Sequence, residues 1–305
     1  MNDAVQPSVP SPPLAVALPW AQSPGRAADF LALTKPRLNL LVVATTVAGY
    51  YLGADRFDFL RLAHTVVGTA LVAGGASAFN QVFERDTDGL MRRTRSRPLP
   101  GGRLPVSTAT VFALVLSIAG LADLALGANL LAAGVAGTTL ACYALVYTPL
   151  KSRTPLSTLI GGVPGGLPPM IGWAAAQGNL ALGAWVLFGI VFLWQMPHFL
   201  AIAWLCREDY ARAGLPMLPV VEPDGRSTAQ QVVLYGSVLV PVSLVPTLIG
   251  LAGRVYFAGA LGLGLAFLAL GLRFARRRTN ETARQLFLGS IAYLPLLWGL
   301  MLGNH

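Results

Sequence analysis

The sequence has few charged residues. Asp, Glu, Lys and Arg together make up 11% of its 305 residues, whereas soluble globular proteins carry roughly 25%. With 54% hydrophobic residues, the chain lacks the polar side chains needed to cover a water-facing surface. The composition therefore excludes a soluble two-domain enzyme and a disordered or collagen-like chain, and it indicates a polytopic membrane protein.

Cysteine and acidic residues are also scarce. Both cysteines, Cys142 and Cys206, lie in or at the end of apolar runs, which argues against a disulfide framework. There are 13 Asp and Glu against 22 Lys and Arg, so the formal net charge is +9. In a soluble protein this excess would suggest nucleic-acid binding. In a membrane protein it is typical of cytoplasmic loops, so we expect no nucleic-acid partner.

Long apolar runs dominate the rest of the sequence. Residues 1–29, rich in Pro, Ser and Ala, predict a disordered cytosolic tail, and residues 30–305 predict a single all-α transmembrane domain. Most apolar runs approach the roughly 20 residues that a helix needs to cross a bilayer. The nine predicted spans cover residues 38–54, 62–83, 106–126, 128–149, 157–175, 180–205, 230–252, 255–275 and 283–302.

The basic residues predict an orientation in the membrane. If the N-terminus is cytosolic, all but three of the 22 Lys and Arg fall on the cytosolic side, and the exceptions are Arg56, Arg61 and Arg254. This bias predicts a multi-pass protein of the cytoplasmic (inner) membrane, with its C-terminus on the outer side. An eight-span arrangement would reverse every loop after the omitted helix and destroy the bias.

A weak internal repeat relates two parts of the chain. Asn80 and His198 are 118 residues apart, and the Pro-rich loop ends at Pro100 and Pro219 are 119 residues apart. Four spans separate the two copies, so both loops fall on the same side of the membrane. The spacing predicts two four-helix repeats plus a ninth helix.

An acidic motif follows the second span. Asn80, Glu84 and Asp88 recur at every fourth residue and would form one polar stripe on a helix, whereas Asp86 falls on another face. Pairing with nearby arginines in water would not explain this single-face spacing. Two carboxylates and an amide oxygen suit a magnesium ion that also binds phosphate oxygens. The motif therefore predicts a site for Mg²⁺ and an anion.

A second polar cluster ends the sixth span. His198 and Asp209 are about three helical turns apart and share a face if the helix continues. Alone, His198 would as readily be a packing residue. Together with Asp209, and with Gln195 and Glu208 nearby, it becomes a candidate for the wall opposite the first motif.

Basic and aromatic side chains are expected on the same cytosolic side. Tyr143, Tyr147 and Lys151 follow one another at four-residue spacing, which places them on one helix face. Topology alone explains most of the other arginines. The candidate anion-binding residues are Lys35, Arg37, Arg92, Arg93, Tyr147, Lys151 and Arg153.

The fifth predicted span is rich in glycine and proline. Residues 157–173 would form a weakened helix, which a membrane tolerates where the freed backbone groups face protein or a cavity. Close helix packing and a wall shaped for a bulky apolar ligand are both compatible with this composition.

Four ordered blocks of sequence carry a family resemblance. Residues 33–37, 80–100, 147–155 and 194–219 resemble the intramembrane aromatic prenyltransferase superfamily and, within it, the protoheme IX farnesyltransferase (heme O synthase) family. The superfamily pattern Asn-Asp-x-x-Asp-x-x-x-Asp maps onto residues 80–88, with Gln81 in place of the first aspartate and Glu84 in place of the second.

The resemblance implies an activity and its partners. A farnesyl group would pass from farnesyl diphosphate to a vinyl group of heme b, with addition of water, giving heme O and diphosphate. Contact with heme A synthase or terminal-oxidase assembly factors stays open. The implied catalytic residues are Asn80, Glu84, Asp88, His198 and Asp209, of which the first three bind Mg²⁺, and Gln195 and Glu208 belong to the second wall.

Two other functions remain as alternatives. A prenyltransferase with a small aromatic acceptor, such as a quinone precursor, would be expected to carry complete aspartate motifs, which this sequence lacks. A transporter would use intramembrane acids as an ion pathway, yet the acids here cluster at span ends and in loops.

Overall fold

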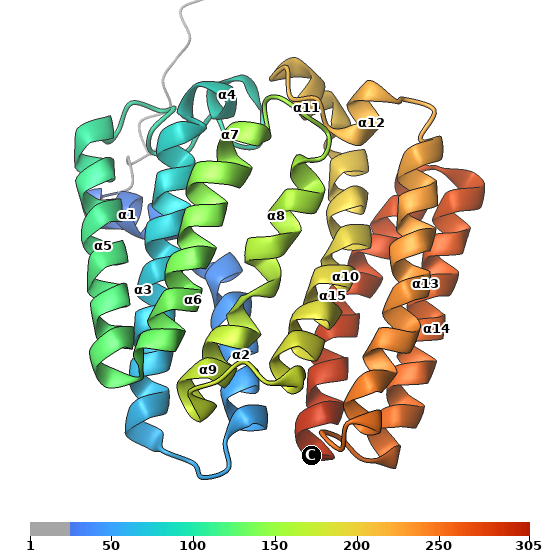
Figure 1. Ribbon diagram of the computed structural model, residues 1–305. Coiled ribbons are helices and arrows are strands. Elements are labelled where there is room, and N and C mark those ends of the chain that lie inside the picture. Colours follow the sequence, from blue (N-terminus) through green and yellow to red (C-terminus); the bar gives the residue numbers. More distant parts are fainter. Residues whose placement is uncertain (1–24) are drawn as a thin grey trace, which may run out of the picture.

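Long apolar helices form the protein. The computed structural model describes residues 25–305, and in this range it contains helices and no strands (Figure 1). The predicted all-α membrane fold is thus confirmed. Seven stretches are long and apolar enough to cross a membrane: α3 (Phe59–Phe83), α5 (Val106–Gly127), Leu130–Leu150, α10 (Leu182–Leu205), α13 (Arg226–Leu248), α14 (Arg254–Arg277) and α15 (Asn280–Gly303).

The predicted count of nine spans is not confirmed. An eighth span arises if α1 (Arg26–Thr34) and α2 (Pro36–Gly53), which meet at a 44° bend, are taken together. The predicted fifth span consists of two ten-residue helices, α8 (Ser157–Gly166) and α9 (Pro168–Gln177). The helix is interrupted at Leu167 because two successive prolines follow it and neither has an N–H to donate. Figure 1 shows α9 continuing from α8 toward the opposite end of the bundle.

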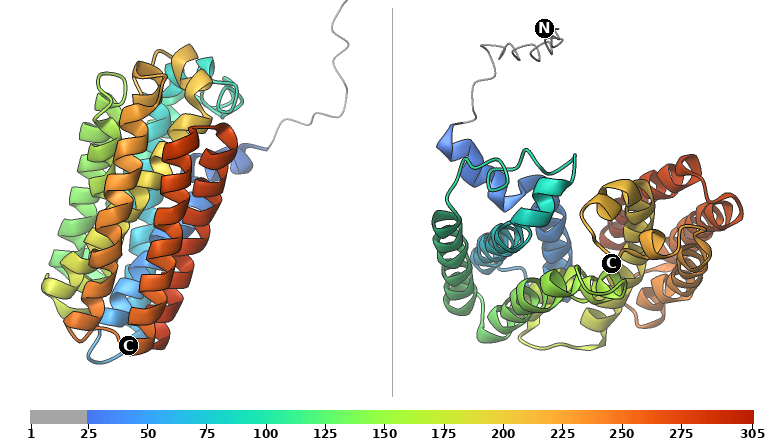
Figure 2. Two further views of the ribbon diagram at one scale, coloured as in Figure 1. Left: turned by 90° about the vertical axis from the view of Figure 1, so that its right-hand side faces the viewer. Right: turned by 90° about the horizontal axis from the view of Figure 1, so that it is seen from above.

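The N-terminal boundary also differs from the prediction. Most of the predicted tail, residues 1–24, lies outside the described residues, but α1 already begins at Arg26. Asp29 in α1 is buried and accepts a hydrogen bond of 2.9 Å from Arg103 Nε. The folded domain therefore starts before residue 30. Figure 2 shows α1 at the periphery of the bundle.

At two places, which we call corners, a long helix is followed at once by a short helix across the end of the bundle. The two corners are alike, in keeping with the predicted duplication. The helix α3 is interrupted at Glu84 and followed by the six-residue helix α4 (Arg85–Leu90). In the same way, α10 is interrupted at Cys206 and followed by the six-residue helix α11 (Arg207–Arg212). Figure 1 shows both corners at one end of the bundle, beside α12 (Leu218–Val221), and the C-terminus at the other.

Glycines allow α2 and α9 to approach closely. A Cβ added at Gly49 would lie against the backbone of Pro169, and a Cβ added at Gly172 would lie against the carbonyl oxygen of Thr46. Such contacts are closer than a real Cβ tolerates, and the opposing atoms are backbone, which cannot rotate away. The Gly/Pro segment is therefore partly explained by helix packing.

We expect Gly172→Ala to destabilise the protein, because the new methyl group must push α9 away from α2. Overpacking of this kind costs about 1–3 kcal/mol. Thermal unfolding of the purified protein in detergent measures the loss. The matched control is Gly134→Ala in α6, where an added Cβ meets nothing within 4 Å. Equal melting temperatures for the two variants would contradict the packing argument.

Candidate active site

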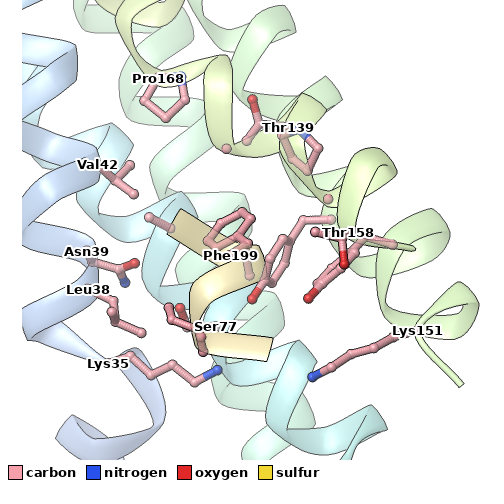
Figure 3. Close-up of a pocket in the computed structure, with 18 of the residues that line it drawn as sticks. Lys35, Leu38, Asn39, Val42, Ser77, Thr139, Lys151, Thr158, Pro168 and Phe199 are labelled. Atoms are coloured by element: carbon pink, nitrogen blue, oxygen red, sulfur yellow. The ribbon is translucent and has the colours of Figure 1, made fainter. Parts of the chain in front are cut away.

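An apolar cavity of about 340 Å³ lies inside the bundle (Figure 3). Aromatic side chains line it: Tyr143 and Tyr147 come from the helical run α6 (Leu130–Ala141), η1 (Cys142–Tyr147) and α7 (Thr148–Leu150), and Phe199 comes from α10. Segment α8 contributes Gly161, Pro164 and Gly165. The Gly/Pro segment thus forms a cavity wall in addition to its packing role.

Two lysines lie at one end of this cavity. Figure 3 shows the ammonium groups of Lys35 and Lys151 pointing toward one another from opposite sides. Lys35 Nζ donates to Asn80 Oδ1 at 2.7 Å. Lys151 Nζ donates to both carboxylate oxygens of Glu84, at 2.9 and 3.0 Å. Each lysine thus links the cavity to a residue of the predicted polar stripe.

The stripe itself keeps its spacing although the helix does not continue. The predicted uninterrupted helix is wrong, since α3 ends at Phe83. The backbone nevertheless preserves the four-residue step, because Glu84 N–H donates to Asn80 O and Asp88 N–H donates to Glu84 O. All three side chains are buried, whereas Asp86 is 86% exposed. The expected separation of Asp86 from the stripe is confirmed.

Asp88 is paired with an arginine that sequence reasoning did not include among the site residues. Arg97 Nη1 donates to Asp88 Oδ2 at 2.6 Å. The loop between them folds back, and Thr94 Oγ1 donates to Asp88 O at 2.8 Å. No helical spacing relates the two residues, so only the loop fold brings them together.

Positive charge exceeds negative charge at this end of the cavity. Lys35, Lys151 and Arg97 face only the two carboxylates of Glu84 and Asp88. Burial opposes the charge on Lys151, but the Glu84 carboxylate bonded to it raises its pKa above the ordinary value, so the side chain stays an ammonium. When Lys35 is protonated, the arrangement has one positive charge in excess, which suits an anion.

A π-helical turn supports the site from the α6 side. In η1 the backbone hydrogen bonds span five residues, a rare geometry that often occurs at functional sites. Thr148 Oγ1 donates to Tyr143 O at 2.8 Å, and Asn80 Nδ2 approaches Thr148 Oγ1 at 3.5 Å. The rings of Tyr143 and Tyr147 lie 5.4 Å apart, and both face the cavity. The predicted alignment of these tyrosines with Lys151 is thus present.

Asp209 joins the two corners. It accepts the backbone N–H groups of Arg92 at 3.3 Å and Arg93 at 3.4 Å, and Arg212 Nη1 at 2.7 Å. Partial desolvation raises the pKa of Asp209, but these donors outweigh it and hold the pKa below the ordinary value. The guanidinium of Arg93 also lies over the ring of Tyr210, 5.3 Å from its centre. The side chain of Asp209 therefore contacts backbone N–H groups of the first motif and does not reach the side chains of the stripe.

His198 is not on the cavity wall. Because α10 ends at Leu205, the predicted shared face with Asp209 does not form. His198 Nδ1 is 2.7 Å from Ser290 Oγ of α15, and its ring stacks on Trp194 and Phe287. The histidine packs between α10 and α15, and its neighbours on α10, Phe199, Ile202 and Ala203, line the cavity in its place.

Other predicted residues do not line the cavity. Gln195 is buried and donates to Gly162 O at 2.7 Å, which ties α10 to α8. Glu208 is exposed, so the predicted second wall does not form as expected. Exposed side chains are also found at Arg37, Arg92, Arg93 and Arg153.

The stripe can supply oxygen ligands to a divalent metal. Within residues 25–305 no group of three or more His, Cys, Asp or Glu is arranged to hold a metal ion. The stripe offers two carboxylates and one amide oxygen, which are ligands that Mg²⁺ prefers. Asp88 Oδ1 is buried and has no hydrogen-bond partner, so one oxygen is free for a cation. The donor set fits Mg²⁺, with Asn80, Glu84 and Asp88 as the residues that would hold it.

Residues 42–298 match the UbiA prenyltransferase family. The chain belongs to this family. A protoheme IX farnesyltransferase of Solibacter usitatus is 53% identical over 284 residues, covering 90% of this chain and 97% of that protein. Proteins of the same name are 44% identical in Koribacter versatilis, covering 95% and 96%, and 45% identical in Myxococcus xanthus, covering 90% and 94%. The resemblance to this branch of the family is therefore confirmed.

Solved structures share the fold. A digeranylgeranylglyceryl phosphate synthase superposes with a TM-score of 0.78 at 18% identity, covering 91% of this chain and 98% of that one. A UbiA homologue of Archaeoglobus fulgidus, bound to GPP and Mg²⁺, gives a TM-score of 0.65 at 16% identity, covering 90% and 99%. At these identities the similarity shows the common fold.

The buried Glu84–Lys151 pair gives a testable energetic signature. Glu84→Gln leaves the buried ammonium without its countercharge and should cost about 3–5 kcal/mol of stability. The double variant Glu84→Gln/Lys151→Met removes both charges and should recover most of that loss. Thermal unfolding in detergent measures both effects.

The matched control is the Arg85–Asp86 pair, whose side chains are 45% and 86% exposed. Replacing Asp86 by Asn should change stability by about 0–1 kcal/mol. A double Glu84/Lys151 variant no more stable than Glu84→Gln would show that the two charges are not coupled.

Proposed function

We propose that this protein transfers a farnesyl group from farnesyl diphosphate to a vinyl group of heme b, with addition of water, giving heme O and diphosphate. The observation that carries the proposal is the lysine pair at one end of the apolar cavity, with each ammonium hydrogen-bonded to the buried stripe. Identity of 40–53% to proteins named protoheme IX farnesyltransferase specifies the acceptor.

The cavity suits the donor. Its apolar walls receive the hydrocarbon chain, and Lys35 and Lys151 receive the diphosphate. Arg97, through its contact with Asp88, adds a third positive charge at that end. Such fixed charges stabilise the negative charge that develops on the leaving diphosphate, and they are most effective where water is excluded.

Magnesium is proposed as the cofactor, held by Asn80, Glu84 and Asp88. When bound, Mg²⁺ would neutralise charge on the diphosphate and so assist its departure. Lys35 contacts the side-chain oxygen of Asn80, and Lys151 contacts both carboxylate oxygens of Glu84, which are the oxygens that Mg²⁺ would use. The proposed roles require the two lysines to release these oxygens to the metal and to bind the diphosphate instead.

The chemistry follows from the placement of charge and aromatic rings. The bond between farnesyl C1 and the diphosphate oxygen breaks, and its electron pair leaves with the diphosphate. The rings of Tyr143, Tyr147 and Phe199 line the cavity, where they can stabilise the allylic cation through their π faces. The terminal vinyl carbon of heme b then forms the new C–C bond. Water adds to the resulting cation beside the porphyrin and releases a proton.

The proposed location is the cytoplasmic membrane, with the cavity end that carries the lysines on the cytosolic side. All but three Lys and Arg lie in segments assigned to that side. The C-terminus lies at the opposite end of the bundle, in agreement with an outer C-terminus (Figure 1).

The direct test is an assay of the purified protein with heme b and farnesyl diphosphate, with and without Mg²⁺. We expect a farnesylated heme, separable by chromatography, that forms only with the metal and is lost on chelation. Prenylated phenols or quinone precursors as the sole products would contradict the acceptor. Full turnover after chelation would contradict the metal.

Substitution of two nearby aspartates, Asp88 of the stripe and the exposed Asp86, tests the role of the stripe in catalysis. Asp88→Asn keeps an oxygen for Arg97 but removes the charge, and we expect kcat/KM to fall on the order of 100-fold. Asp86→Asn, two residues away and 86% exposed, is the control and should retain full activity. Steady-state rates at saturating heme compare the two variants. Equal rates would remove Asp88 from the active site.

A further inference from the structure

Side chains donate hydrogen bonds to the backbone carbonyls at the C-terminus of α1. The last four carbonyls of a helix have no partner within it and must find one elsewhere. Thr34 Oγ1 donates to Leu31 O at 2.8 Å, and Asn39 Nδ2 donates to Thr34 O. The two carbonyls between them depend on a residue of α3, forty-seven positions further along the chain than Thr34.

That residue is Gln81. Its amide nitrogen donates to Leu33 O at 2.9 Å and to Ala32 O at 3.2 Å. Ala32 O also accepts the N–H of Lys35, but at 3.4 Å this bond is long. A single buried amide of α3 therefore closes the end of α1.

The orientation of this amide is fixed by its surroundings. Gln81 is 1% exposed, and its Oε1 is buried without a hydrogen-bond partner. Rotating the amide by half a turn would place Oε1 against two carbonyl oxygens, where no proton lies between them. The side chain thus acts as a donor at this position and leaves its acceptor unused.

The helix end held by Gln81 is followed directly by Lys35. Lys35 adopts the left-handed conformation, with φ 48° and ψ 58°, which is unfavourable for a residue with a Cβ. Among residues 25–305 only Arg278 is another non-glycine with positive φ. Such strain persists when neighbouring contacts hold the backbone in place. Asn80, adjacent to Gln81 on α3, binds the ammonium of the same lysine.

The geometry points to Gln81 as a positioning residue that holds the α1–α2 turn so that the Lys35 ammonium faces the diphosphate end of the cavity. This inference rests on the proposed function, because it assigns Lys35 to the diphosphate. Gln81 does not line the cavity and acts through the backbone of α1. A donor is required, so a carboxylate of the same length cannot replace it.

The test is Gln81→Glu, which keeps size and shape. An ionised carboxylate has no proton to donate, and its negative charge would face the carbonyl oxygens of Ala32 and Leu33. We therefore expect Gln81→Glu to bind farnesyl diphosphate about tenfold or more weakly than the wild type. Binding is measured without heme, on protein in detergent.

Gln81→Met supplies the second arm, since its side chain has similar length and no donor. The KM for farnesyl diphosphate should rise about tenfold, and the KM for heme should stay unchanged. Gln230→Glu on the exposed face of α13 is the control and should follow the wild type throughout.

A Gln81→Glu variant that binds farnesyl diphosphate as tightly as the wild type overturns the inference, whether or not Gln81→Met folds. An unchanged KM for farnesyl diphosphate in Gln81→Met overturns it as well. Failure of the proposed function looks different: the wild type itself would then bind no farnesyl diphosphate or form no farnesylated heme.

Discussion

Charge compensation at the end of the apolar cavity that carries the two lysines is the constraint on which the rest of the structure depends. Two carboxylates are buried there, and uncompensated they would be costly in so apolar a setting. Lys151 and Arg97 neutralise them, and Lys35 adds a further positive charge on Asn80. A binding site for a diphosphate and its metal needs both signs of charge at short range. The ion pairs that stabilise the substrate-free protein therefore also hold in place the basic side chains that would bind the diphosphate.

The corner loops keep these groups in place from outside. Each loop follows a long helix that is interrupted at one residue, so a short helix turns across the end of the bundle. Asp209 of the second corner accepts two backbone N–H groups of the first, and Arg93 covers Tyr210, which lines the cavity. The two corners thus meet through hydrogen bonds from backbone N–H groups to the Asp209 side chain.

Sequence periodicity was sufficient for the stripe and the aromatic wall, because both depend on repeats of about four residues along helices. The burial of Glu84 follows that pattern, whereas its pairing with Lys151 is a tertiary contact that the pattern does not predict. Three further features lay beyond it. Arg97 reaches Asp88 only because its loop folds back, Asp209 binds backbone atoms, and His198 packs against Ser290 of α15. Loop paths and helix ends depend on tertiary contacts that a single sequence does not display.

Irregular backbone concentrates around the cavity, and the membrane setting gives the reason. The α1–α2 turn, the α8–α9 interruption and the π-helical turn η1 each leave the regular hydrogen-bond pattern, and each contributes lining residues. Facing lipid, such groups would have no partners; facing protein or a cavity, they can find them. Gln81 closes one of these irregular ends and Thr148 another. Three of the positions where helical regularity fails therefore contribute residues to the cavity wall.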